Sequence, residues 1–198
     1  HDACGVGLIA STEGKKSRAI VEYGIEALKA VWHRGAVDAD GKTGDGAGIH
    51  VEIPKDFFIE KIQVTGHDYD NSEICVGMIF LPRNDYSAQE SCKTIVESEL
   101  TKNNFSIYGW RQVPVNPKVL GEKALQTMPE IIQVLFKSND PNLLDKNLER
   151  KIYETRKRIE NKAFDASLNN FYICSISSKS IIYKGLYLAE AISDFYLD

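Results

Sequence analysis

A thiol beside two glycines is the feature near the start of the sequence with the clearest chemical potential: Cys4 is followed by Gly5 and Gly7. Because glycine has no side chain, a substrate carbonyl and backbone donors can approach such a thiol closely. Free cysteine is also among the residue types most often buried, so an inert core position is the more common explanation of any single cysteine. Cys4 is therefore a candidate nucleophile that needs support from other residues.

The other cysteines give no such indication. Cys75 and Cys174 lie within apolar runs typical of strands, and Cys92 lies in a segment typical of a helix. The four cysteines are far apart, without a Cys-x-x-Cys pair or a Cys/His cluster at metal-ligand spacing, so we expect neither a metal site nor a dense disulfide framework. This pattern predicts a reducing, cytoplasmic environment.

Residues 35–48 form a glycine-rich segment whose spacing excludes two common ligand-binding motifs. The segment has five glycines and three aspartates and contains Gly41-Lys42-Thr43. A phosphate-binding P-loop requires glycine at position 36, where this chain has Ala36, and it follows a strand, whereas this segment follows a predicted helix. A calcium-binding EF-hand loop is excluded because Lys42 stands where a third acidic ligand belongs. We therefore predict a long, turn-rich loop.

The triplet His33-Arg34-Gly35 directly precedes this loop. By itself, it is typical of a helix end, where cations meet the negative end of the helix dipole and glycine adopts the left-handed cap. Its sequence alone does not require a catalytic role.

The charge pattern excludes some classes of partner. The net charge of -4 comes from 28 acidic and 24 basic residues spread along the chain, so we expect no binding of nucleic acid. No apolar run is long enough to cross a bilayer, so we expect no membrane partner. The first three residues, His1-Asp2-Ala3, are neither a signal peptide nor a natural start, and we expect them to be a leader remnant of a larger protein.

The elements that must position these residues alternate between strands and helices. Apolar, strand-like runs cover residues 5–10, 49–53, 74–81, 105–113, 131–136, 172–176 and 181–183, with the last two predicted to pair. Helical periodicity covers residues 17–33, 87–101, 119–125 and 144–163. This mixed order favours an α+β layered domain over a regular doubly wound sheet.

Several of these segments together resemble the class II glutamine amidotransferase domain of glutamate synthase, in order and over essentially the whole chain. The resemblance is specific as a combination, although each motif alone is weak. It is carried by Cys4-Gly-Val-Gly-Leu-Ile-Ala10, His33-Arg-Gly-Ala36, Asp40-Gly-Lys-Thr-Gly-Asp-Gly-Ala-Gly48, Val76-Gly-Met-Ile-Phe-Leu81, Tyr108-Gly-Trp-Arg-Gln-Val-Pro114, Leu120-Gly-Glu122, Arg156 to Glu160, and Phe171-Tyr-Ile-Cys-Ser-Ile176 through Tyr183-Lys-Gly185.

The resemblance implies an N-terminal-nucleophile hydrolase fold, a four-layer αββα sandwich with two antiparallel sheets between helical layers. Residues 1–198 would be the N-terminal portion of that domain, incomplete at its C-terminal side. The mature enzyme of this family begins with its nucleophilic cysteine, which corresponds here to Cys4 after removal of residues 1–3.

The resemblance also implies roles for individual residues. Arg34 and Gly35 match residues that line the nucleophile, with Gly35 acting through its backbone, and Asp45 is a candidate for ordering the loop. The main substrate-binding arginine motif and the asparagine-glycine oxyanion donors of the family would lie beyond Asp198. Because loss of one oxyanion donor costs about 100- to 1000-fold in rate, we predict negligible glutaminase activity for the isolated segment.

The implied function is hydrolysis of glutamine to glutamate and ammonia, with the ammonia passed to synthase domains of the same polypeptide for amination of 2-oxoglutarate. No cofactor is implied for this segment, whereas FMN and an iron–sulfur cluster are implied for the full-length enzyme. The electron donor, either ferredoxin or a small subunit that uses reduced nicotinamide, stays open. Two alternatives also stay open: the amidotransferase domain of another class II enzyme, and a catalytically silent binding or regulatory module.

Overall fold

The structure is a computed structural model that describes residues 5–31 and 35–198. Cys4, His33 and Arg34 lie outside the described residues. Within the described residues, helices and strands are mixed along the chain, and each pair of neighbours in the larger sheet is antiparallel. The α+β prediction is therefore confirmed.

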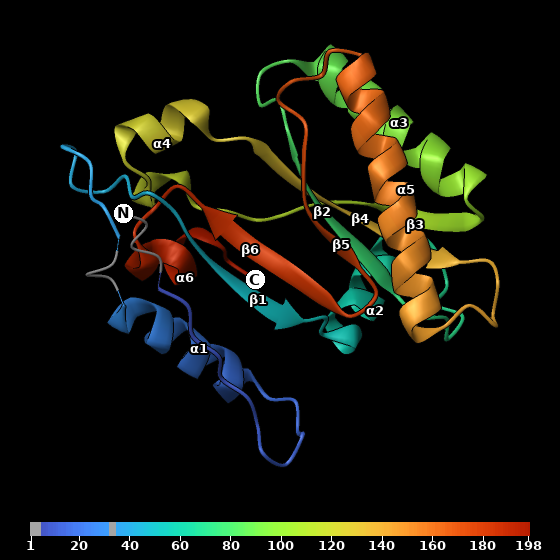
Figure 1. The fold of residues 1–198 in the computed structure, drawn as a ribbon, viewed down its shortest axis with the longest axis horizontal. Coiled ribbons are helices and arrows are strands. Elements are labelled where there is room, and N and C mark those ends of the chain that lie inside the picture. The colour runs from blue at the N-terminus through green and yellow to red at the C-terminus, as the bar shows by residue number, and fades with distance from the viewer. Residues whose placement is uncertain (1–4, 32–34) are drawn as a thin grey trace. The chain divides into compact units, whose positions relative to one another are not determined.

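The chain divides into two compact units (Figure 1). Unit 1 contains the residues up to Val51, together with Pro114–Met128 and Ile182–Asp198. Unit 2 contains Glu52–Val113 and Pro129–Ile181. The segment Pro114–Met128 belongs to unit 1, although in the sequence it connects two neighbouring strands of the unit 2 sheet.

Unit 2 is built on a four-stranded sheet in the order β3-β4-β2-β5. The two central strands have long apolar runs, and most of their residues on both faces are buried. The strand bounds are β2 Cys75–Leu81, β3 Phe105–Gln112, β4 Glu130–Ser138 and β5 Tyr172–Ser177.

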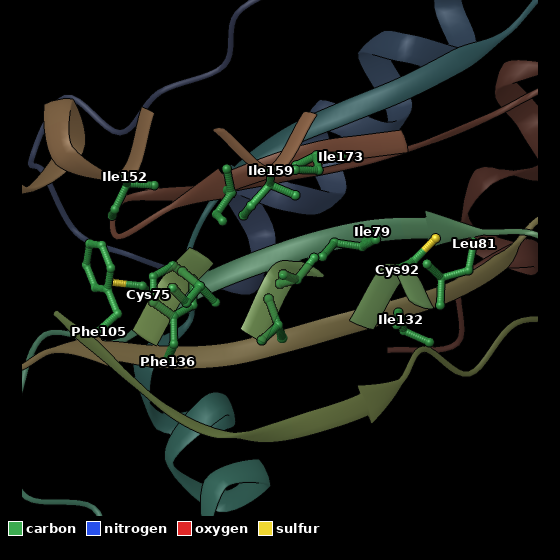
Figure 2. Close-up of a cluster of buried hydrophobic side chains, with 14 of the residues drawn as sticks. Cys75, Ile79, Leu81, Cys92, Phe105, Ile132, Phe136, Ile152, Ile159 and Ile173 are labelled. Carbon is green, nitrogen blue, oxygen red and sulfur yellow. The ribbon is translucent and has the colours of Figure 1, made fainter. Parts of the chain in front are cut away.

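Two long helices, α3 (Tyr86–Lys102) and α5 (Asp145–Asp165), pack against each other and against this sheet. The buried residues of α5 recur every three or four positions, which places them on one face of the helix. Figure 2 shows two of them, Ile152 and Ile159, in the main hydrophobic core together with side chains of the sheet and of α3. A third helix of unit 2, α2 (Lys55–Val64), buries Phe58 and Ile62 completely.

Unit 1 holds the shorter elements. Helix α1 (Arg18–Ala30) has an apolar stripe but no fully buried residue. Strand β1 (Ala47–Glu52) pairs with β6 (Ser180–Gly185), and each strand runs at one end into unit 2. The remaining elements are the 3-10 helices η2 (Pro117–Val119) and η3 (Ala189–Ala191) and the short helices α4 (Glu122–Thr127) and α6 (Ile192–Phe195).

Aromatic rings and backbone bonds stabilise the C-terminal part of unit 1. The Phe195 ring lies 4.9 Å from that of Tyr196 and 5.3 Å from that of Tyr187, measured between centroids. The Asn116 N–H donates to the carbonyl of Phe195 at 2.8 Å, and the Tyr196 hydroxyl donates to the Lys184 carbonyl at 2.8 Å. The first bond connects the segment before α4 to α6, and the second connects Tyr196 to β6.

Three expectations about the elements are wrong. Residues 5–10 form no strand, and Val6 and Leu8 are 94% and 88% exposed. A buried strand needs hydrogen-bonded neighbours, and in the part of the chain that the structure describes β1 and β6 pair only with each other. The first helix ends at Ala30, whereas the periodicity predicted an end near residue 33.

The third wrong expectation is the pairing of the last two strands. Strand β5 pairs with β2, and β6 pairs with β1, so the chain changes sheets between them. The Glu149 carboxylate accepts hydrogen bonds from the Ser177 hydroxyl at 3.0 Å and from the Ser178 N–H at 2.7 Å. These bonds satisfy donors at the turn, where a hairpin would have used ladder bonds.

Candidate functional site

Two of the four predicted site residues lie within the described part of the chain. Gly35 and Asp45 are both exposed, and they stand near the two ends of the glycine-rich loop. Cys4 and Arg34 fall outside the described residues, so the structure does not place them. The loop from Gly35 to Gly48 is consequently the part of the candidate site whose geometry can be built from the residues upward.

The loop folds back on itself. The Asp38 N–H donates to the Thr43 carbonyl at 2.9 Å, and the Gly41 N–H donates to the Asp38 carbonyl at 2.9 Å. Near the loop ends, the Asp45 N–H donates to the Ala36 carbonyl at 3.3 Å. Gly41 provides the positive φ of 69° that the turn at its tip requires. The first and last parts of the loop are therefore held side by side.

The Asp40 carboxylate is the main polar centre of the loop. Its Oδ1 accepts hydrogen bonds from the N–H groups of Lys42 at 2.9 Å and Thr43 at 2.7 Å, and its Oδ2 accepts one from the Thr43 hydroxyl at 2.5 Å. Hydrogen bonds from the Thr43 hydroxyl, from the Thr43 and Lys42 N–H groups and from the Glu122 N–H hold the pKa of Asp40 far below its ordinary value. These hydrogen bonds therefore favour the ionised form of Asp40.

Gly121 lets the loop contact the beginning of α4. A Cβ atom at position 121 would lie 2.5 Å from the Thr43 nitrogen and would overlap with Asp40 Oδ2 and Thr43 Oγ1. The φ of -73° at Gly121 is available to any residue, so the close approach, and not the backbone conformation, requires glycine here. The Leu120-Gly-Glu122 motif thus forms the surface against which Asp40 and Thr43 of the loop pack.

A second acidic residue also connects the loop to α4. The Lys123 ammonium contacts Asp38 Oδ2 at 2.6 Å, and the Ala39 N–H donates to Asp38 Oδ1 at 2.6 Å. The hydrogen bond from Lys123, followed by that from Ala39, lowers the pKa of Asp38. Reciprocally, the bond to Asp38 raises the pKa of Lys123.

The glycines at the C-terminal end of the loop allow close packing as well. A side chain at Gly44 would collide with the Tyr187 carbonyl at 2.7 Å, and one at Gly48 would collide with the Tyr183 carbonyl at 2.8 Å. The glycine-rich composition of this segment therefore serves contacts within unit 1.

The sequence motifs contain Asp40 and Gly121 but assign neither a role. Asp45 is the residue predicted to order the loop, but the Asp40 carboxylate accepts three hydrogen bonds within the loop, whereas Asp45 contributes its backbone N–H. The available signal was the Asp40-Gly-Lys-Thr43 pattern, because an aspartate commonly accepts hydrogen bonds from N–H groups two and three residues later. The roles of Cys4, Arg34, Gly35 and Asp45 stay predictions.

The Tyr108-Gly-Trp-Arg-Gln motif belongs to the framework of unit 2. The Tyr108 hydroxyl donates to Asp70 Oδ1 at 2.9 Å, and Asp70 Oδ2 pairs with Lys137. The Trp110 indole N–H donates to a Glu97 carboxylate oxygen at 2.6 Å. These side chains connect β3 to its neighbours, which explains the motif without assigning it to chemistry.

Among residues 5–31 and 35–198, no group of three or more His, Cys, Asp or Glu side chains could hold a metal ion. The three cysteines in this range are free and buried. Burial raises the pKa of the Cys75 thiol strongly and that of Cys92 to about 11, so neither is a thiolate at neutral pH. No helix in the described residues is long and apolar enough to cross a membrane.

Comparison with known proteins gives consistent matches across the chain. The family model "Glutamine amidotransferases class-II" matches residues 4–198. The glutamate synthase [NADPH] large chain of Azospirillum brasilense is 54% identical over 198 residues, which are 100% of this chain and 13% of that protein. Ferredoxin-dependent glutamate synthase 1 of Arabidopsis thaliana is 39% identical over 99% of this chain and 12% of its own length.

A cyanobacterial relative gives the same result: ferredoxin-dependent glutamate synthase 2 of a Synechocystis strain is 37% identical over 100% of this chain and 12% of its own length. The chain thus spans only 12 to 13% of the length of these curated relatives.

Proposed function

Since the chain belongs to the class II glutamine amidotransferase family, a family with the N-terminal-nucleophile hydrolase fold, we propose that it hydrolyses glutamine to glutamate and ammonia, with Cys4 as the nucleophile. The observation that carries this proposal is the family match over residues 4–198, whose first residue is Cys4. A second observation supports it: the three cysteines of the described region are buried in the protein, where they cannot reach a substrate.

The proposed reaction requires cleavage of the chain directly before Cys4, which gives Cys4 a free α-amine. A thiol with a pKa of about 8.5 and an α-amine with a pKa of about 7.7 to 8.0 can exchange a proton at a cost of about 1 kcal/mol. The amine therefore serves as the base for its own side chain. The thiolate attacks the side-chain amide carbon of glutamine, the amine returns the proton to the leaving nitrogen, and ammonia departs. Water then hydrolyses the thioester to glutamate and regenerates the thiol.

The residues next to the loop have supporting roles in this proposal. Arg34 helps to hold the site that lines the nucleophile, and Gly35 acts through its backbone. Asp45 contributes to the order of the loop through its N–H bond to Ala36.

We further propose that the chain is the glutaminase part of a glutamate synthase, in which ammonia passes to other domains and aminates 2-oxoglutarate. FMN and an iron–sulfur cluster would serve that second reaction. The described residues do not fit such a cluster, because the three cysteines among them lie in β2, α3 and β5 and form no metal-binding group. In this proposal the cluster and FMN are bound by other domains of the longer protein.

The names of the relatives bear on the electron donor, and the cysteines bear on the compartment. The relative that is 54% identical has NADPH in its name, whereas the ferredoxin-dependent relatives of Arabidopsis and Synechocystis are 39% and 37% identical. This difference favours reduced nicotinamide, delivered by an electron-donating subunit, over ferredoxin. The free thiols of Cys75, Cys92 and Cys174 favour a reducing compartment, which we propose to be the cytoplasm.

The proposal is tested in the full-length protein by comparing wild type with Cys4→Ala and with Cys92→Ala as a control for a buried thiol. Glutamine hydrolysis and labelling by an electrophilic glutamine analogue are measured for each. We expect hydrolysis and labelling to disappear in Cys4→Ala and to persist in Cys92→Ala. A wild-type protein that neither reacts with the analogue nor hydrolyses glutamine would instead be a silent module of the same fold.

A further inference from the structure

The Asp40 carboxylate accepts hydrogen bonds from more donors than an amide in its place could satisfy. Its two oxygens receive the N–H groups of Lys42 and Thr43, the Thr43 hydroxyl and the N–H of Glu122. An asparagine would offer one oxygen to these four donors and would point an NH2 group at the others. The arrangement is therefore specific for a carboxylate.

The bonds of Asp40 connect the loop to a different part of unit 1. Thr43, which is 8% exposed, and Asp40 both lie against Gly121, and Glu122 begins α4. Val37 and Gly44 form a bridge, and the Ala36 carbonyl accepts from the Asp45 N–H. The backbone of Ala36 and Val37, just after Gly35, is thereby connected to Gly44 and Asp45, which directly follow Thr43.

Little else holds this part of the loop in place. Residues 35–42 are exposed or half-buried, and only Thr43 and Gly44 of the loop are buried. A segment with so little apolar burial can open locally while the remaining structure stays folded. Loss of the Asp40 bonds should consequently disturb the loop more than it disturbs either unit.

We propose that Asp40 is a positioning residue for the glutaminase reaction, which it serves by holding the loop that begins at Gly35 against the start of α4 through Thr43. This inference rests on the proposed function, because Gly35 matters for the reaction only if Cys4 is the nucleophile. In this role Asp40 acts through the backbone of the loop, whose N–H groups and Thr43 hydroxyl it binds.

Three variants of the full-length protein test this role, with one matched control. Asp40→Asn removes the second acceptor oxygen, Thr43→Val removes the hydroxyl at nearly constant shape, and Thr43→Ser keeps the hydroxyl. The control is Lys42→Ala, because the Lys42 side chain is exposed and its backbone N–H bond to Asp40 survives the change. Steady-state kcat and KM for glutamine are measured, together with labelling of Cys4 by the glutamine analogue and by iodoacetamide.

We expect kcat to fall by about 100-fold in Asp40→Asn and Thr43→Val, the loss that a misplacement of about 1 Å can cause. Thr43→Ser and Lys42→Ala should keep most of the wild-type kcat. Labelling by the glutamine analogue should slow in step with kcat, whereas labelling by iodoacetamide, which needs only the thiol, should not change. Rescue by serine separates positioning from a general loss of folded protein.

The results that overturn the inference differ from those that overturn the proposed function. A wild-type protein without glutaminase activity refutes the function. An active wild type whose Asp40→Asn and Thr43→Val variants keep full kcat refutes only the positioning role. Equal loss in Thr43→Ser and Thr43→Val also refutes it, because the hydroxyl would then be irrelevant.

Discussion

Replacement of Gly121 by alanine tests the packing of the loop from the opposite side, without changing any loop residue. The added methyl group would lie 2.5 Å from the Thr43 nitrogen, whereas ordinary contacts of a Cβ atom lie between 3.4 and 4 Å. Thr43 and Asp40 must therefore move by about 1 Å. Because the backbone angles at Gly121 suit alanine, the cost comes from this overlap alone.

The size of the effect follows from typical overpacking energies. Insertion of one extra methyl group into a close contact costs about 1 to 3 kcal/mol. If the cost appears as local opening of the loop, the amides of Asp38 and Thr43 should exchange with solvent deuterons about 5- to 150-fold faster. The same 1 Å displacement should lower kcat for glutamine by about 100-fold.

The assay is hydrogen exchange of the full-length protein, followed by mass spectrometry of peptides that cover residues 35–48. Gln126→Ala is the matched control, because Gln126 is exposed on the same helix, α4. Wild-type exchange and wild-type kcat in Gly121→Ala would show that the loop is not held against Gly121, and the reasoning about Asp40 would then fail as well.

Three further predictions concern groups outside the loop. Glu149→Ala should lower the free energy of unfolding of unit 2 by about 1 to 3 kcal/mol, because the buried Ser178 N–H loses its acceptor. Urea denaturation, followed by the hydrogen exchange of residues 172–181, measures this change. An unchanged urea midpoint would contradict the prediction. The hydrogen bond from Lys162 lowers the pKa of Glu99 below its ordinary value of 4.5. The ionised Glu99 carboxylate therefore stabilises the folded protein above pH 4.5, and this stabilisation is lost as the pH falls through the lowered pKa. The loss of stability in acid should be smaller in Glu99→Gln than in the wild type, and equal losses in the two proteins would contradict this prediction. Because burial raises the pKa of Cys92 to about 11, iodoacetamide at pH 8 should modify Cys4 and leave Cys92 unmodified, and rapid alkylation of Cys92 would show that it is accessible.

The framework of unit 2 could be predicted from sequence because its signals are local. The apolar runs of β2 and β4 and the periodic apolar positions of α3 and α5 each specify their own element. Helix α2 was not predicted, since its amphipathic pattern is weak although half of its residues are apolar and Pro54 marks its start.

Features that depend on partners distant in sequence could not be predicted in the same way. The run at residues 5–10 has the composition of a strand, but a strand also needs neighbours to pair with. Strands β5 and β6 are separated by only two residues, yet they belong to different sheets. At their junction, the carboxylate of Glu149, which is distant in sequence, accepts hydrogen bonds from Ser177 and Ser178. Pairing depends on such contacts as much as on local propensity.

The candidate site was predictable only through the combination of motifs. The spacing of the glycines in residues 35–48 excludes a phosphate-binding loop, but it does not show what the glycines contact. In the structure the loop packs closely against Gly121 and Tyr187. Asp40 and Asp45 look equivalent in the sequence, and only the fold shows which carboxylate receives the convergent donors.

The proton transfer proposed for Cys4 is tested most directly by mass spectrometry of the N-terminus of the native, active protein after reaction with the glutamine analogue. We predict an N-terminal peptide that begins at Cys4 and carries the label on that residue. An active protein whose labelled peptide still contains His1-Asp2-Ala3 would contradict the account, because the amine of Cys4 would then be an amide and could not accept the proton of the thiol.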